Sequence, residues 1–272
     1  MRPTALLALL AASALLAGCL KETQVVKLNA DGSGTVTVTS IMKTAAVEKM
    51  REMAKAFGGA EGKTNDPFSE DQARKRAEKM GEGVEFVSCE KIKTADEEGL
   101  KSVYSFKDIT KLKVSDQPET PQPGGPGAGA GPKKEPITFK FAKQASGNLL
   151  LTIVNPVGKD MKEPGGKEEK DEKEDVNDAQ LGMMKEFLGG LKISVQLQVA
   201  GKIVKTNTPH VDGSTVTIIE MDFDKMLADS EKFKKLAKAS PKSLDDAKAL
   251  VKDFPGVKVC VDPEITVEFT AP

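Results

Sequence analysis

Cys19, near the amino terminus, is the residue whose sequence context most clearly predicts covalent modification of a thiol. Cys19 ends the tetrapeptide Leu16-Ala17-Gly18-Cys19, which closes an apolar run that starts at Ala5 and is broken only by Ser13. Small side chains before a cysteine suit a peptidase that needs an extended, unhindered backbone. The run of about 12 residues matches the apolar core of a signal peptide, and a helix that spans a bilayer needs about 20. The sequence therefore predicts a signal peptide at residues 1–18.

The tetrapeptide resembles the lipobox of bacterial lipoproteins. The resemblance implies that Cys19 receives a diacylglyceryl thioether, that cleavage follows Gly18 and that the new amino group is acylated. Two or three acyl chains anchor a protein stably, because each buried methylene contributes about 0.8 kcal/mol. We therefore expect the membrane as a partner and an extracytoplasmic location, at the periplasmic face or the cell surface. Leu20 in the next position, rather than Asp, points to the outer membrane where the host has one. The alternative is an ordinary signal peptide with a chance cysteine.

The other two cysteines, Cys89 and Cys260, would lie in a compartment where disulfides persist. Strand alternation puts each of them on the more polar face of a predicted strand, where a bridge between neighbouring strands is feasible. The sequence leaves two alternatives open, a Cys89–Cys260 disulfide or two half-buried free thiols. Neither cysteine has a histidine or a Cys-x-x-Cys partner that would indicate reactivity.

Several other patterns imitate known sites and fit them poorly. Residues 29–34 begin like a calcium loop, but Ser40 stands where the bidentate acid should be. Two Ser-x-x-Lys spacings, which begin at Ser40 and Ser88, lack the companion motifs of that class of hydrolase. The glycine-rich residues 124–131 lack the strand and helix of a phosphate-binding loop. We therefore expect a plain hairpin turn, chance spacings and a linker.

The single histidine and one pair of carboxylates are the remaining candidates for chemistry. His210 has no second imidazole nearby in the sequence, so zinc is not expected, although it could act as an acid or base with Asp212. Asp222 and Asp224 could bind a cation or a sugar, but their position where a strand meets a helix favours helix capping. The favoured interpretation of His210 is a loop residue without a catalytic role. We predict no metal and no cofactor.

A lysine-rich stretch is a candidate for membrane contact. Its lysines accompany Phe233 and Leu236 on an amphipathic helix that could lie on anionic lipid. Asp229 and Glu231 dilute the positive charge, so a solvated helix face is the favoured interpretation. The lysines are Lys232, Lys234, Lys235 and Lys238.

The composition excludes several classes of protein. The 40 basic and 41 acidic residues nearly cancel, so the chain lacks the positive charge from which nucleic-acid-binding proteins gain affinity. Hydrophobic residues make up 39% of the 272 residues, enough for a folded core but too few for several membrane spans. We therefore expect no nucleic acid among the partners.

Alternating apolar residues predict strands, and apolar residues three and four apart predict helices. Asp31-Gly32 marks a tight hairpin turn, and Ser69 and Ser243 are helix N-caps by their place before such helical patterns. The expected strands are residues 25–29, 35–40, 84–93, 101–107, 137–143, 149–154, 192–199, 215–221, 257–261 and 264–269. The expected helices are residues 46–57, 69–81, 179–188, 224–239 and 243–252.

Hairpin-linked strands with helices grouped between them predict an α+β fold, a mostly antiparallel sheet with several helices packed on it. Two solvated excursions, a Pro/Gly-rich linker at residues 116–136 and a charged loop at residues 159–178, are expected to be disordered. We expect one domain assembled from two halves, residues 19–115 and 137–272. Two domains separated by the linker are the alternative.

The order of features resembles that of LppM-type bacterial lipoproteins. The similarity rests on Gly18-Cys19-Leu20-Lys21 running into a hairpin, on residues 103–109, and on residues 199–207 before the Asp212-Gly213 turn. The resemblance implies a β-rich extracytoplasmic domain in contact with membrane glycolipids, and it supplies no catalytic residues. This sequence departs from the family because it lacks a C-terminal transmembrane helix.

We therefore expect a lipoprotein whose anchored domain is not an enzyme and serves binding or envelope structure, because a complete lipobox accompanies no recognisable catalytic set. The alternative is a carrier or sensor that encloses a lipid, a glycolipid or another apolar ligand. In either case a lipid or an envelope component is the expected partner. An enzyme with an unrecognised site at His210 or Asp222 is the third hypothesis.

Overall fold

A computed structural model describes residues 20–57, 66–115, 135–156, 181, 182, 185, 188–239, 243–252 and 254–272. The predicted signal peptide, Cys19, the charged loop at 159–178 and residues 116–134 of the linker lie outside the described residues. The described part is α+β with mostly antiparallel strands, which confirms the predicted fold class.

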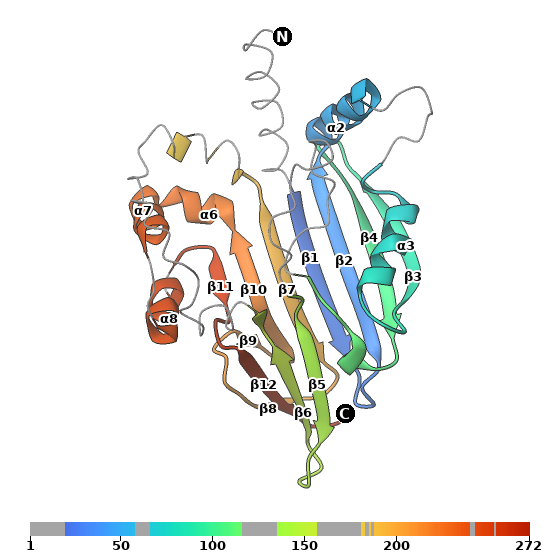
Figure 1. Cartoon of the computed structure of the whole chain (residues 1–272), viewed down its shortest axis with the longest axis vertical. Helices are drawn as coiled ribbons and strands as arrows, with labels where there is room; N and C mark the ends of the chain where they lie inside the picture. The colour runs from blue at the N-terminus through green and yellow to red at the C-terminus, as the bar shows by residue number, and fades with distance from the viewer. Residues whose placement is uncertain are drawn as a thin grey trace.

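Most strands of the described part form one large sheet. They are β1 Leu20–Leu28, β2 Gly34–Lys43, β3 Glu85–Lys93, β4 Glu97–Phe106, β7 Lys192–Val199, β9 Val211–Asp212, β10 Thr215–Asp222 and β11 Val257–Val259. The order is β11-β10-β7-β1-β2-β4-β3, with β9 beside β10 (Figure 1). β1 and β7 are parallel and connect strands from the two halves of the chain, and all other neighbours in this sheet are antiparallel.

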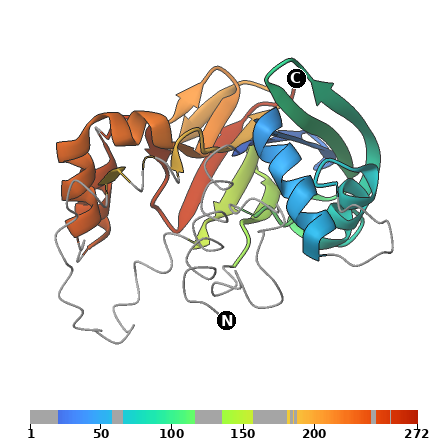
Figure 2. The ribbon, with the colours of Figure 1, turned by 90° about the horizontal axis from the view of Figure 1, so that it is seen from above.

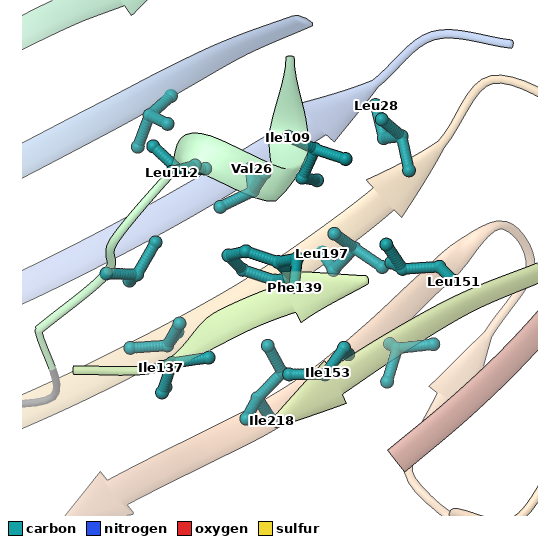
Figure 3. Packing of buried hydrophobic residues seen from close by; sticks show 14 of the residues in the cluster. Val26, Leu28, Ile109, Leu112, Ile137, Phe139, Leu151, Ile153, Leu197 and Ile218 are labelled. Atoms are coloured by element: carbon teal, nitrogen blue, oxygen red, sulfur yellow. The ribbon is translucent and has the colours of Figure 1, made fainter. Parts of the chain in front are cut away.

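A second, antiparallel sheet lies on one face of the large sheet (Figure 2). Its strands, in spatial order, are β5 Thr138–Lys143, β6 Leu149–Val154, β12 Glu264–Phe269 and β8 Ile203–Thr206. Val26 and Leu197 of the large sheet pack in one cluster with Phe139 and Leu151 of the small sheet (Figure 3). We call the face of the large sheet that carries Val26 and Leu197 the inner face.

The helices lie at the margins of this sandwich. They are α2 Thr44–Phe57, α3 Glu70–Lys79, the 3₁₀ turn η2 Ile109–Lys111, α6 Phe223–Ala228, α7 Ser230–Lys238 and α8 Leu244–Lys252. Val47 of α2 and Ala73 of α3 pack with Leu20 of β1 in a second cluster, and α6 and α7 pack around a third. The predicted helix at 224–239 is two helices, because Asp229 leaves helical geometry and caps α7 by accepting from the Lys232 N–H.

Local sequence signals gave correct turns and caps. The β1–β2 connection is a plain hairpin turn as predicted, in which Gly32 has φ +88° and Asp31 accepts from the Ser33 N–H at 2.9 Å. Ser69 accepts from the Gln72 N–H at the start of α3, and Ser243 accepts from the Asp246 N–H before α8. These bonds satisfy amide groups that a helix leaves unpaired at its first turn.

Candidate functional site

A polar cleft lies between α3 and the inner face of the large sheet. Its volume is about 70 Å³. β1, β2 and β4 supply one wall, and α3 with the residues just before it supplies the other. The polar residues of the walls include Glu22, Ser40, Gln72, Arg76, Ser102 and Tyr104.

A buried ion pair between Glu22 and Arg76 contributes to the lining of this cleft. Glu22 is 2% exposed, and the Arg76 side chain is 11% exposed. Arg76 donates from Nη2 to Glu22 Oε1 at 2.7 Å and from Nη1 to Oε2 at 3.3 Å. Ser40 Oγ donates to Oε2 at 2.9 Å, and Gln24 Nε2 donates to Oε1 at 3.0 Å. Each oxygen of the carboxylate therefore accepts from two donors. Hydrogen bonds and an opposite charge of this kind offset the cost of burying a charged group.

The hydrogen bonds of this cluster favour a structural or binding role for Glu22 over a catalytic one. Both oxygens of the Glu22 carboxylate accept hydrogen bonds from Arg76, and one of them also accepts from the Ser40 hydroxyl, so the carboxylate is engaged in holding these two side chains. Gln24 also donates to the Ser115 carbonyl at 2.8 Å, which fixes the segment after η2 to the same cluster. The cluster therefore connects α3, β1, β2 and that segment through hydrogen bonds.

The rim of the cleft carries positive charge. Lys75 and Lys79 of α3 line the opening, and Lys79 also lines a neighbouring cleft of about 50 Å³ together with Lys113 and Gln24. Cationic rims attract anionic groups, most strongly at low ionic strength. The arrangement suits contact with a small polar or anionic group.

Neither cleft has the size of a pocket for an apolar ligand. Pockets for drug-sized ligands enclose about 300–1,000 Å³, several times the 70 Å³ and 50 Å³ found here. Between the two sheets, fully buried side chains such as Ile153 and Ile218 occupy the space (Figure 3). An acyl chain would have to displace packed side chains to enter at either place.

Cys89 and Cys260 are both free thiols, so the predicted disulfide is wrong. Cys89 lies in the edge strand β3, whereas the Cys260 N–H donates to Ile218 of β10. Five strand spacings of about 4.8 Å separate β3 from β10 along the sheet, and a disulfide needs Cα atoms within about 7 Å. The second alternative, two free thiols, is the one found.

The polar surroundings predicted for the two cysteines are only partly found, because Cys89 shares its face of β3 with Lys91 but also with Phe86, and Cys260 is buried. A bulge at Val87 shifts the register of β3, so that Phe86 pairs with Tyr104 and Cys89 with Ser102 on the inner face. Cys260 is 5% exposed, and burial raises the pKa of its thiol to about 11. The sulfur lies 2.9 Å from Thr208 Oγ1, a contact that supports the thiol in the core.

The two Ser-x-x-Lys spacings do not bring their side chains together. Ser40 shares the inner face of β2 with Val38, and strand alternation sends Lys43 to the opposite face. Ser88 and Lys91 likewise pair with residues on opposite faces of β4. Both spacings are therefore chance, as predicted.

His210 is a half-buried residue of the loop before β9. Burial, followed by the nearby Lys258, lowers the pKa of its imidazole, while Glu220 acts in the opposite direction. Its backbone carbonyl accepts from the Thr217 N–H at 2.9 Å. Asp212, the predicted partner, lies exposed in β9.

The two carboxylates at the β10–α6 junction accept hydrogen bonds from backbone amides. Asp222 is the N-cap of α6 and accepts from the Lys225 N–H at 3.3 Å, which confirms the predicted capping role. Asp224 accepts from the Gly190 N–H at 2.7 Å. The two side chains thus fix two segments of the chain.

The lysine-rich helix α7 is packed by its apolar side. Phe233 is buried with Met226, Leu227 and Phe254 in the third cluster, and Leu236 packs against it. The apolar side is therefore occupied by the fold. The predicted solvated face is found at Lys232 and Lys235, whereas Lys234 is half-buried and the Lys238 side chain lies outside the described part. Lys232 pairs with Asp229 at 3.4 Å.

The described residues contain neither a cluster of metal-ligating side chains nor a membrane-spanning helix. No group of three or more His, Cys, Asp and Glu side chains there lies close enough to hold a metal ion. No helix in that part of the chain combines the length and the apolar character that crossing a membrane requires.

Comparison with known proteins assigns no family. No family model, curated protein or solved structure matches this chain. The resemblances to the lipobox and to LppM-type lipoproteins therefore stay predictions.

The sequence interpretation missed the residues that build the cleft. It started β1 at residue 25, whereas the strand begins at Leu20. Glu22 and Gln24 have the same parity as Leu20 and Val26, so alternation extended backwards would have placed both side chains on the inner face. Arg76 had no such signal, because its partner is 54 residues away.

Proposed function

We propose that this chain is an extracytoplasmic bacterial lipoprotein, anchored through acyl chains on Cys19, whose folded part is a non-enzymatic binding or envelope-structural domain. The observation that carries the proposal is the tetrapeptide Leu16-Ala17-Gly18-Cys19 at the end of an apolar run of signal-peptide length. The outer membrane, where the host has one, is the proposed membrane, because Leu20 rather than Asp follows the cysteine.

The chemistry of the polar cleft supports a binding or structural role over catalysis. Glu22, a candidate base next to the Ser40 hydroxyl, is neutralised by Arg76 and fully hydrogen-bonded. The lysine rim offers contacts to a polar or anionic group of an envelope component. The filled space between the sheets gives less support to the alternative of a carrier for an apolar ligand.

Metabolic labelling with palmitate tests the anchor. We expect the unaltered chain to take up label and the Cys19→Ser variant to take up none. Cys89→Ser is the matched control, because Cys89 is a half-buried thiol of the folded domain and its loss should leave labelling unchanged. Label retained by Cys19→Ser, or lost by Cys89→Ser, would refute the assignment of Cys19.

Mass spectrometry of lipids that copurify with unacylated protein tests the carrier alternative. We expect the protein to be purified without a stoichiometric lipid, because the two clefts together offer far less volume than an acyl chain needs. A reproducible lipid at one copy per chain would favour the carrier.

A further inference from the structure

The residue that follows the proposed lipid attachment site is fixed inside the fold. Leu20 is 4% exposed and begins β1, paired with Met42 of β2. Its side chain packs in the second cluster with Val47 and Leu100. Consecutive Cα atoms are about 3.8 Å apart, so Cys19 is covalently held at that distance from a buried, strand-paired residue. A lipid on Cys19 would therefore be joined to the domain without a linker.

Other elements reach the same end of the large sheet. The register places Lys43 opposite Glu97, and Lys192 opposite both Lys21 and Asp222. α2 follows β2 and α6 follows β10, so both helices lie at this end, and the β5–β6 hairpin lies at the opposite end (Figure 1). We call this surface the anchor end, defined by α2, α6, Lys21, Lys43, Glu97, Lys192 and Asp222.

Ion pairs hold the anchor end together. Arg51 of α2 pairs with Glu98 of β4 at 2.9 Å, and the Glu98 side chain is only 10% exposed. Lys21 of β1 pairs with Glu97 of β4 at 2.7 Å, across β2. The helix and the strand ends therefore form one surface in a fixed relation to Leu20.

The charges of the anchor end are mixed. Lys192 and Lys225 both pair with Asp222, at 3.8 and 3.5 Å, and Lys93 pairs with Glu98 at 3.7 Å. A surface with paired charges of both signs is compatible with a zwitterionic headgroup layer and gains little from anionic lipid. Its placement on a membrane would follow from the attachment point rather than from net charge.

We infer that the anchor end lies on the surface of the bilayer and that the β5–β6 hairpin points away from it, in one fixed orientation. The inference rests on the proposed function, because it requires acyl chains on Cys19. The nine residues of β1 span about 27 Å from Leu20 to Leu28. The Asp31-Gly32 turn and the β5–β6 hairpin are therefore presented on the side of the domain that faces away from the membrane.

Fluorescence quenching in vesicles tests the orientation. The acylated chain, in a Cys89→Ser background, receives a fluorophore at either Lys43→Cys or Ala145→Cys, both at exposed positions. Phosphatidylcholine vesicles carry a nitroxide quencher on the lipid headgroup. We expect loss of fluorescence from the probe at position 43 and no loss from the probe at position 145. Equal loss at both positions, or no loss at position 43, would overturn the inference.

A linker variant supplies the matched control. About ten Gly and Ser residues inserted between Cys19 and Leu20 give a reach of about 17 Å, so we expect the difference between the two probes to disappear while the fold is retained. The mass of the N-terminal peptide, measured on the same samples, separates the two proposals. An acylated peptide with no difference between probes refutes only the orientation, and a peptide without acyl mass refutes the proposed function and the inference together.

Discussion

The inner face of β1 is covered in two different ways along its length. Val26 and Leu28 meet the small sheet in a wholly apolar core. Glu22 and Gln24, on the same face and in the same strand, meet Arg76 of α3 and the Ser115 carbonyl. The apolar region is stabilised by the area it removes from water, so neighbours can compensate for one another. In the polar region stability depends on matched donors, acceptors and charges, because a buried charge that loses a partner has little water to replace it.

The largest effect is expected from breaking the ion pair on one side. Glu22→Ala removes the carboxylate that pairs with the buried Arg76 and accepts from Ser40 and Gln24, which should lower the free energy of unfolding by about 3–5 kcal/mol. Urea denaturation of the variant and the unaltered chain measures the loss. A loss below about 1 kcal/mol would show that water reaches Arg76 and that the two regions of β1 are alike.

Replacing both partners sharpens the comparison. In the double variant Glu22→Leu with Arg76→Met, the ion pair of this cluster is replaced by apolar side chains, so we expect stability close to that of the unaltered chain or higher by about 1–4 kcal/mol. A double variant as unstable as Glu22→Ala would contradict the view that pairing, rather than shape, governs this region.

The apolar region should respond differently to truncation. Leu197 is fully buried opposite Phe139, so Leu197→Ala should lower the free energy of unfolding by about 2–5 kcal/mol through lost contact and a residual cavity. We expect partial recovery when a neighbour is enlarged to refill the volume, again measured by urea denaturation. A loss of less than about 1 kcal/mol would mean that the space between the sheets is loosely packed.

A smaller effect concerns the buried thiol at the margin of the apolar core. Burial raises the pKa of the Cys260 thiol to about 11 in the folded chain, from 9.0 for a thiol that is not buried. The unfolded state therefore loses the proton first as pH rises, so stability should fall between about pH 9 and 11, by at most about 2–3 kcal/mol. Cys260→Ala should lack this part of the pH dependence. An identical slope in both chains would contradict the burial of Cys260.

Alkylation gives an independent check of the same thiol. At about pH 8 the native chain should protect Cys260 because the thiolate is scarce and the sulfur is buried. Denatured, unreduced protein should yield both Cys89 and Cys260 as free thiols. If neither cysteine could be alkylated in denatured, unreduced protein, the two would be joined in a disulfide and the assignment of free thiols would be wrong.

Local signals in the sequence predicted much of the fold, and contacts distant in sequence were not predictable. Asp31-Gly32 and Ser69 act within a few residues, so their turn and cap could be identified correctly. The parallel pairing of β1 with β7 joins Val26 to Leu197, which no short pattern encodes. The bulge at Val87 places Cys89 on the same face as Phe86, because one extra residue shifts strand alternation.

The candidate site was less predictable than the fold for the same reason. Glu22 could have been placed on the inner face by alternation, but Arg76 belongs to a helix whose charged residues are otherwise solvated. That the two meet follows from how α3 packs against the sheet. The short strands β8 and β9 were missed because two to four residues carry too little pattern to distinguish them from loop.

The most direct test of the account is the mass of the amino-terminal peptide of the native protein isolated from its own cells. We predict that the mature chain begins at Cys19 and that this peptide carries the added mass of a diacylglyceryl group and an N-linked acyl chain. A native chain that retains residues 1–18 with no added mass at Cys19 would contradict the account.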